Sequence, residues 1–242
     1  VTQTGLRAAG LDLAVASPSV EGPLSLDVEQ SVIAGGNASS GARIVTNQGG
    51  DADAVLASIG QFLAAAADSA VGLYIDVTNR LGSGNIRVDV GSDDATVGGV
   101  DVSGAGAVGG VIRSASTEGE TGALDVDIAG DLLVSGAGAS GMELGTSAGT
   151  GVGAVNVAID GSIASAGADA AGLQLLASAG SGIAAVDLAT TGNAAASGER
   201  ASALALVLDA LEAVAGVSTT IGGGLRADGD DSQGVKLAAT AG

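Results

Sequence analysis

Short runs in which apolar and polar residues alternate return along this chain every 31 residues. The clearest unit is Gly167-Ala-Asp-Ala-Ala-Gly172-Leu-Gln-Leu175, one of eight copies of the same frame. The others are Gly5 to Leu13, Gly36 to Ile44, Ala67 to Ile75, Ala105 to Arg113, Gly136 to Leu144, Gly198 to Leu206 and Gly229 to Leu237. A fixed period of this length predicts a stack of similar units rather than one globular core.

Period-two alternation predicts three short strands in each repeat, because alternate side chains of a strand point to the same face. The strands of one repeat are Val155–Ile159, Ile163–Ser165 and Leu173–Leu175, with glycine corners between them. The first strand recurs at Leu24–Val28, Val55–Ile59 and Leu124–Ile128, the second at Leu63, Leu132 and Leu225, and the third at Leu73, Met142 and Val235. We therefore expect an all-β parallel β-solenoid of about eight coils, with residues 1–242 forming a single elongated domain.

One step of the repeat is longer than the others. The step from Ala67 to Ala105 is 38 residues, which predicts an insertion of seven near 91–98. Strict alignment then puts Asp101 and Arg113 in columns that hold apolar residues in the other repeats. One interpretation is that the two residues form a buried ion pair or site. The alternative is a slide of one residue that turns Val100 and Val102 inward and leaves Asp101 outside, with Arg113 reaching out past a wider coil. Because a buried unpaired charge is costly, we favour the slide.

The segment from Ser202 to Val214 is ambiguous. Its leucines alternate as in a strand, but Leu204, Val207, Leu208 and Leu211 also follow a helical stripe. Its position in the repeat favours a strand.

Composition limits the class of protein and its partners. Hydrophobic residues make up 46% of the chain and Pro only 2 residues, so we expect it to fold. Phe62 and Tyr74 are the only aromatic residues, so the interior must be narrow and filled by Ala, Val, Leu and Ile. The net charge of −19 argues against nucleic acid and anionic membranes as partners. The longest uncharged stretch, Ala170 to Val186, is too short to span a membrane.

The sequence contains no recognisable active site. It has no His and no Cys, which removes the usual nucleophile–base pairs and zinc sites. Carboxylates predicted to face outward could form a sugar-cleaving pair, or simply a solvated face: Asp125, Asp127, Asp160 and Asp187. We favour the solvated face, since two aromatic residues make a poor platform for sugar rings, and we expect no catalytic residue.

Two acidic clusters are candidates for calcium, which prefers carboxylate and carbonyl oxygens. One is Asp93 and Asp94 in the insertion, and the other is Asp228, Asp230 and Asp231 near the end. Neither matches an EF-hand loop or the glycine-rich calcium nonapeptide, so we favour solvated acidic turns. We therefore expect no cofactor, with calcium as the one candidate.

The run Gly161-Ser-Ile-Ala-Ser-Ala-Gly-Ala-Asp-Ala-Ala-Gly-Leu-Gln-Leu-Leu-Ala-Ser-Ala-Gly-Ser-Gly182 resembles the repeats of large Gram-negative autotransporter passengers and haemagglutinin-like proteins. The resemblance covers nearly the whole chain. It implies a right-handed parallel β-helix, secreted and displayed outside the outer membrane. Two departures are a shorter glycine-rich turn and the absence of an aromatic-rich translocator barrel after residue 242, so a separately secreted subunit remains an alternative to a passenger fragment.

From these observations we expect a non-enzymatic, structural or adhesive β-solenoid at the bacterial cell surface. A filament or anchor subunit that stacks end to end is the alternative, and an enzyme acting on polysaccharide is the outside alternative. The start at Val1 suggests a processed or excised segment, and neither end carries a capping segment. Expected partners are other copies stacked end to end, surface-assembly proteins, polysaccharide, and host or abiotic surfaces.

Overall fold

The computed structural model describes residues 2–3, 9–15, 23–48, 54–91 and 98–241. Within these ranges every ladder is parallel, and three long sheets run along the molecule. Sheet A contains β1 (Thr2–Gln3), β4 (Val32–Ala34), β7 (Phe62–Ala65), β11 (Gly99–Val102), β15 (Asp131–Val134), β18 (Ile163–Ser165), β21 (Ala194–Ala196) and β24 (Leu225–Ala227).

Sheet B contains β2 (Ala9–Val15), β5 (Ser40–Gln48), β8 (Val71–Asn79), β12 (Val108–Ser116), β16 (Ser140–Ala148), β19 (Ala171–Ala179), β22 (Ser202–Ala210) and β25 (Gln233–Ala241). Sheet C contains β3 (Leu24–Val28), β6 (Val55–Ile59), β10 (Ile86–Val90), β14 (Leu124–Ile128), β17 (Val155–Ile159), β20 (Gly182–Thr190) and β23 (Ala213–Ile221). A small extra ladder pairs β9 (Gly82–Ser83) with β13 (Glu120–Thr121).

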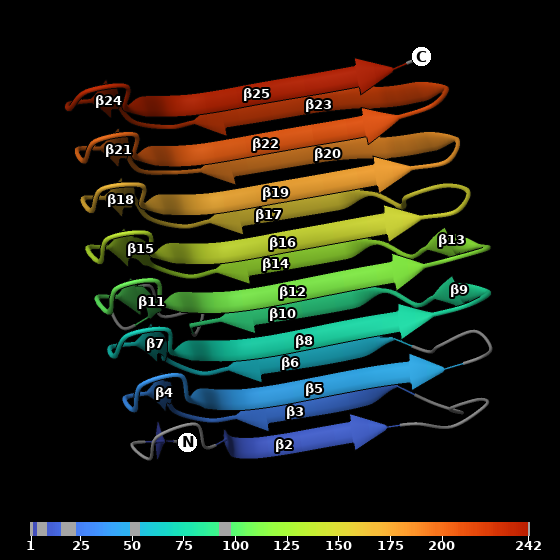
Figure 1. Cartoon of the computed structure of the whole chain (residues 1–242), viewed down its shortest axis with the longest axis horizontal. Helices are drawn as coiled ribbons and strands as arrows, with labels where there is room; N and C mark the ends of the chain where they lie inside the picture. Colours follow the sequence, from blue (N-terminus) through green and yellow to red (C-terminus); the bar gives the residue numbers. More distant parts are fainter. Residues whose placement is uncertain (1, 4–8, 16–22, 49–53, 92–97, 242) are drawn as a thin grey trace.

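The chain is a β-solenoid of about seven turns, which confirms the predicted fold class. Sheets A and B hold eight strands each, one for every predicted copy, and sheet C holds seven. In Figure 1 the strands of sheet B run to the right in front, and the chain returns to the left behind them through sheet C while it climbs from N to C. This sense of winding is right-handed.

Alternate residues of each strand fill a narrow apolar interior. In sheet B, one inward column holds Ile44, Ile75, Ile112, Leu144, Leu175 and Leu206, which are register partners from turn to turn and are all buried. The core consists almost entirely of Ala, Val, Leu and Ile, as composition predicted. Burial of each large aliphatic side chain contributes about 1.5–3 kcal/mol, so these ladders hold neighbouring turns together.

The third strand of each repeat is longer than predicted. We expected runs such as Leu173–Leu175, but β19 extends over nine residues, from Ala171 to Ala179. Its second half alternates small residues, Ala177 and Ala179 facing inward and Ser178 half-buried on the other face. Small residues carry little β-propensity, so the sequence pattern did not mark this half. The segment from Ser202 is a strand, β22, as its place in the repeat predicted.

The register places the seven extra residues in two positions. Phe62 pairs with Gly99, a step of 37, so six extra residues lie between β10 and β11. The seventh lies after β12, because Ile86 pairs with Leu124, a step of 38. The insertion near 91–98 is therefore one residue shorter than the uniform alignment implied, and residues 92–97 lie outside the described part.

This register settles the two charged residues that broke the repeat. Val100 and Val102 are buried and Asp101 is exposed, as the slide predicted. The slide also carries through β12, where Ile112 takes the inward position and Arg113 lies on the exposed outer face. Our picture of Arg113 reaching past a wider coil was wrong, because a one-residue shift moves every side chain to the opposite face.

One corner of each turn adopts a left-handed backbone conformation. The third residue of the frame has φ between 52° and 63° at Ala38, Ser69, Gly106, Gly138, Asp169, Arg200 and Asp231. The first residue of the frame must be small, because a Cβ on Gly167 would lie 2.1 Å from the carbonyl oxygen of Gly136 in the turn below. Close stacking of turns thus explains the glycine that marks the repeat.

A second corner is tied together by side chains. Asp131 Oδ1 accepts a hydrogen bond from the Ser162 backbone N–H at 2.7 Å. Ser162 Oγ accepts one from the Asn193 N–H at 3.1 Å, and Asn193 Oδ1 accepts one from the Gly224 N–H at 2.7 Å. Each side chain therefore binds the backbone of the following turn, which keeps the turns in register at this corner.

Polar side chains also enter the core, mainly in the third to fifth turns. Ser83 Oγ and Ser114 Oγ lie 2.6 Å apart. The side chains of Thr46 and Asn79 are buried as well, but Thr46 Oγ1 and both polar atoms of the Asn79 amide have no hydrogen-bond partner among the described residues. An unpaired buried amide is costly, so this is the least favourable part of the described interior.

On the last turn, inward-facing side chains are open to solvent. Leu225 and Leu237 are 56% and 53% exposed, whereas their register partners Ala194 and Leu206 are buried. No helix in the described residues is long and apolar enough to cross a membrane.

Candidate functional site

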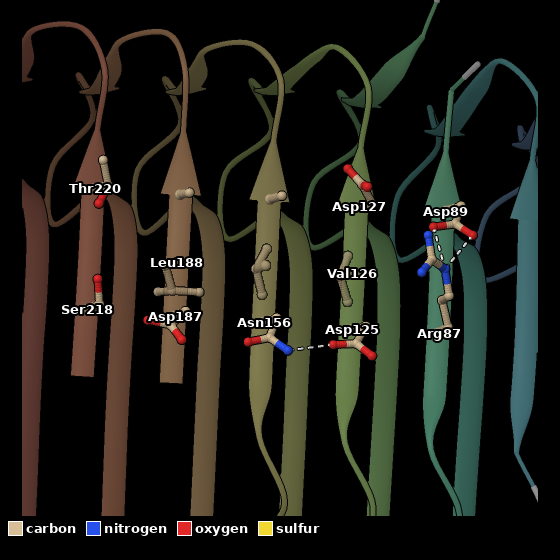
Figure 2. A pocket seen from close by; sticks show the side chains of 13 residues that line it. Arg87, Asp89, Asp125, Val126, Asp127, Asn156, Asp187, Leu188, Ser218 and Thr220 are labelled. Atoms are coloured by element: carbon tan, nitrogen blue, oxygen red, sulfur yellow. Dashed lines mark hydrogen bonds and ion pairs between the residues drawn. The ribbon is translucent and has the colours of Figure 1, made fainter. Parts of the chain in front are cut away.

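A hollow with a volume of about 540 Å³ lies on the outer face of sheet C. It crosses β10, β14, β17, β20 and β23, whose apolar residues point into the core and whose alternate residues point outward. Two outward columns line it. The first column is Arg87, Asp125, Asn156, Asp187 and Ser218, and the second is Asp89, Asp127, Ala158, Ala189 and Thr220. Figure 2 shows these side chains on consecutive strands.

The depth of the groove follows from the sizes of the side chains. In the second column, Ala158 and Ala189 lie between the longer Asp127 and Thr220. In the first column every one of these strands carries a polar group. Neighbouring strands of a sheet are about 4.8 Å apart, so the groove presents polar groups at that spacing along the long axis of the solenoid.

Arg87 is the only basic residue in the described lining. Its Nε donates to both carboxylate oxygens of Asp89, two residues along the same strand, at 3.1 and 3.0 Å. This hydrogen bond, together with the charge of Asp89, raises the pKa of the Arg87 guanidinium above its usual value, and the charges of Asp127 and Asp125 add to the effect. With four carboxylates and one guanidinium, the groove has a net charge of about −3 at neutral pH.

Asn156 is held in one orientation. Its Nδ2 donates to Asp125 Oδ1 on the strand below at 2.6 Å, as Figure 2 shows. The amide oxygen of Asn156 then remains available as an acceptor beside Asp187. The groove thus offers both donors and acceptors of hydrogen bonds, from Arg87, Asn156, Ser218 and Thr220 as well as from the carboxylates.

The structure gathers three of the four outward carboxylates that the sequence suggested. Asp125, Asp127 and Asp187 all line the groove. Asp160 does not, because it follows β17 at the corner and contributes to a separate hollow on sheet A. Sequence analysis missed Arg87 and Asn156, although aligning the repeats in register would have placed them in the column of Asp125.

The calcium candidates are not assembled into a site in the described residues. Asp228 forms an ion pair with Arg226, and Asp230 and Asp231 lie exposed in the corner between β24 and β25. No group of three or more acidic, His or Cys residues that could hold a metal ion occurs in the described part of the chain. Asp93 and Asp94 lie outside the described residues.

The two aromatic residues lie on different sheets. The centroid of the Tyr74 ring, in β8, lies 5.8 Å from the guanidinium carbon of Arg43, and the Tyr74 hydroxyl donates to Asp76 at 3.1 Å. Partial burial, followed by the charge of Asp76 and the hydrogen bond to it, raises the pKa of Tyr74. Phe62 lies in β7 of sheet A. Neither contributes to the lining of the sheet C groove, so its described lining contains no aromatic platform.

Comparison with known proteins does not identify the family of this chain. No protein-family model, curated protein or solved structure matches the chain. The fold and the site therefore carry the functional argument.

Proposed function

We propose that this protein is a non-enzymatic, extracellular structural or adhesive β-solenoid that contacts its ligand through the outer face of sheet C. The observation that carries the proposal is the groove formed by the two outward columns, which repeats polar groups on five consecutive strands. An extended ligand lying along the axis would meet a similar set of groups at every turn. Many weak contacts of this kind give useful avidity without one deep pocket.

The chemistry of the lining favours a polysaccharide as that ligand. A sugar hydroxyl both donates and accepts hydrogen bonds, and the groove offers acceptors in Asp125 and Asp187 and donors in Asn156 and Ser218. The net negative charge disfavours strongly acidic polymers. A neutral or weakly cationic polysaccharide therefore suits the groove best.

The proposed location is the surface of a Gram-negative bacterium, as a secreted or outer-membrane-associated protein. The support is the resemblance of the 31-residue repeat to autotransporter passengers and haemagglutinin-like proteins. The right-handed parallel solenoid is the fold that this resemblance implied (Figure 1).

Retention on a panel of insoluble neutral and weakly cationic polysaccharides tests the proposal. The test variant is the double substitution Asp125→Ala and Asp187→Ala, which removes two carboxylates from the groove. A matched control is Glu143→Ala with Asp209→Ala, since these residues lie outward on sheet B and the change in charge is the same. We expect the first variant to lose retention and the control to keep it. Equal retention by both, or no retention of the unmodified protein on any polymer, would contradict the proposal.

A polysaccharide-cleaving enzyme is the second candidate, favoured by the spacing of two carboxylates. Asp125 and Asp127 point outward from one strand two residues apart, about 6.6 Å along the backbone, close to the lower limit of about 6.5 Å for inverting glycosidases. Such an enzyme also needs a general acid shielded from water. Asp127 is exposed and Asp125 is half-buried beside a hydrogen-bonding amide, which favours binding over catalysis. Release of reducing ends that Asp127→Asn abolishes would establish the enzyme instead.

A further inference from the structure

A second hollow, of about 320 Å³, lies on the outer face of sheet A and has a different chemistry from the groove on sheet C. We propose that it binds the guanidinium group of an arginine side chain from a partner protein. The site combines an exposed aromatic ring with three carboxylates that form no ion pair with a described basic residue. It lies on another sheet and takes another class of ligand, so it does not depend on the polysaccharide proposal.

The register of sheet A creates the hollow. Phe62 in β7, Gly99 in β11 and Asp131 in β15 are successive partners in one outward column. Gly99 is buried, and a Cβ there would lie 2.3 Å from the Asp131 carbonyl oxygen, so no side chain stands between Phe62 and Asp131 in this column. The backbone of Gly98 and Gly130 lines the same hollow.

The width of this gap fits a cation held between the ring and a carboxylate. Two strand spacings separate Phe62 from Asp131, about 9.6 Å. A cation attracted to an aromatic face lies within about 6 Å of the ring centroid. A charge-assisted hydrogen bond to a carboxylate adds about 2.8 Å. The sum of the ring-to-cation and cation-to-carboxylate distances is close to the separation of about 9.6 Å between Phe62 and Asp131.

The charges around the hollow are not neutralised within the described part of the protein. Asp131, Asp160 and Asp101 are exposed, and none forms an ion pair with a described basic residue. Among the described residues, Asp131 Oδ1 accepts a hydrogen bond from the Ser162 N–H at 2.7 Å, and Asp160 Oδ1 accepts one from the Thr191 hydroxyl at 3.0 Å. Their Oδ2 atoms therefore remain for a ligand.

The side chains of the lining decide between a cation and a sugar. Apart from the carboxylates, the exposed side chains of the described lining are apolar: Phe62 and Leu133. Phe62 and Leu133 are 40% and 43% exposed, large fractions for apolar side chains of this size. No lining side chain donates a hydrogen bond, so a group that only donates fits best, and guanidinium and ammonium groups have no acceptor. Leu133 offers an apolar surface for the aliphatic stem of the ligand.

Guanidinium suits the hollow better than ammonium. It is planar, stacks on aromatic rings, and presents its donors in a fork that can reach two carboxylates together. The occupant is therefore expected to be an arginine presented by a protein segment, rather than a lysine or an amino sugar.

Titration of the whole chain with N-acetyl-arginine amide, followed by NMR of Phe62 and Leu133, tests the site. We expect shifts confined to this hollow, and weaker binding by N-acetyl-lysine amide and glucosamine. Phe62→Ala should weaken arginine binding by roughly threefold or more, the range of a cation–π contact. Asp131→Asn should also weaken binding while keeping Oδ1 as the acceptor for Ser162, so the fold is preserved.

Two matched controls distinguish this site from general attraction to an acidic protein. Leu56→Ala removes a large side chain that is 40% exposed on sheet C, and Asp209→Asn removes one carboxylate from sheet B. Both should bind arginine as the unmodified protein does. Shifts spread over sheet C, an equal loss of binding in the controls, or tighter binding of glucosamine than of arginine would overturn the proposal. None of these results bears on retention by polysaccharide, which tests the groove separately.

Discussion

Arg200 forms a bidentate ion pair with Asp169, the residue at the same corner one turn below. Arg200 Nε lies 2.7 Å from Asp169 Oδ1, and Nη2 lies 2.7 Å from Oδ2. Both residues have the left-handed backbone conformation of this corner. The pair therefore joins two turns at a point where each backbone turns sharply.

The first prediction concerns the pH dependence of this pair. The hydrogen bond and charge of Arg200 lower the pKa of the Asp169 carboxyl. A lowered folded-state pKa contributes stability that is present above the unfolded value of 3.8 and is lost as the pH falls through the folded value. Arg200→Gln should therefore lower the melting temperature slightly near neutral pH, and the difference should disappear in strong acid or high salt.

Lys236→Gln is the control for that measurement, since it removes one exposed positive charge from the last turn. Its effect should show no such decline in acid. If the loss caused by Arg200→Gln were the same at every pH, the ion pair would not be its cause.

The second prediction uses the same corner in another turn. Ala38 has φ of 52°, where Gly106 and Gly138 occupy the equivalent positions. A non-glycine residue there costs about 1–2 kcal/mol, so Ala38→Gly should stabilise the protein by roughly 0.5–1 kcal/mol after the entropy of glycine is allowed for. Ala168→Gly, one position earlier in the frame, should destabilise it. Urea unfolding of the two variants decides the matter, and stabilisation by both would show that the effect is not local.

The third prediction concerns the buried amide of Asn79. Both of its polar atoms lack partners, so Asn79→Leu removes an unpaired polar group at similar volume and should raise the free energy of unfolding by about 1–3 kcal/mol. Ser83→Val should lower it, because it leaves the buried Ser114 hydroxyl without its partner. Destabilisation by Asn79→Leu in the same chemical denaturation experiment would mean that an internal water satisfies the amide.

The fourth prediction compares neighbours on one strand. Leu175 is 1% exposed and lies in the inward ladder of sheet B, whereas Gln174 is exposed. Leu175→Asp places an unpaired charge in the core and should cost more than about 4 kcal/mol. Gln174→Asp should change stability little, since it loses only a hydrogen bond to Ser140. Similar melting temperatures for the two variants would reverse the assigned faces.

The sequence predicted the architecture because every turn repeats the same physical problem. Alternation at Val155, Val157 and Ile159 identifies inward positions, and the fixed period places these columns above one another. What it did not predict were features that depend on exact register. In the fourth turn, Gly104 rather than Ala105 is the first residue of the repeated frame. An alignment that assumes one insertion cannot show at which positions the extra residues lie.

The candidate sites were predicted less completely than the fold. Outward acids such as Asp125 and Asp187 were identified one by one, but a groove depends on side-chain size in adjacent columns, as at Ala158 and Ala189. The hollow beside Phe62 depends on which residues of the next turn lie opposite the ring, and Phe62 pairs with Gly99 only at a step of 37 residues rather than 38. Neither arrangement leaves a local motif in the sequence.

The central claim is that successive turns lie directly above one another in register, which places the outward columns as described. One outward column of sheet B runs through Asn47, Thr78, Ala115, Ser147, Ser178, Asp209 and Thr240. The chain contains no Cys, so spin labels on introduced cysteines report only the chosen pairs.

Pulsed EPR distances from position 240 to positions 47, 78 and 115 provide the most direct test. These pairs are six, five and four turns apart, which predicts backbone separations of about 29, 24 and 19 Å at about 4.8 Å per turn. A regular decrease of about 4.8 Å from one pair to the next would support the stacked solenoid. Distances that are equal, irregular or broadly distributed would contradict it, and with it the placement of both proposed binding surfaces.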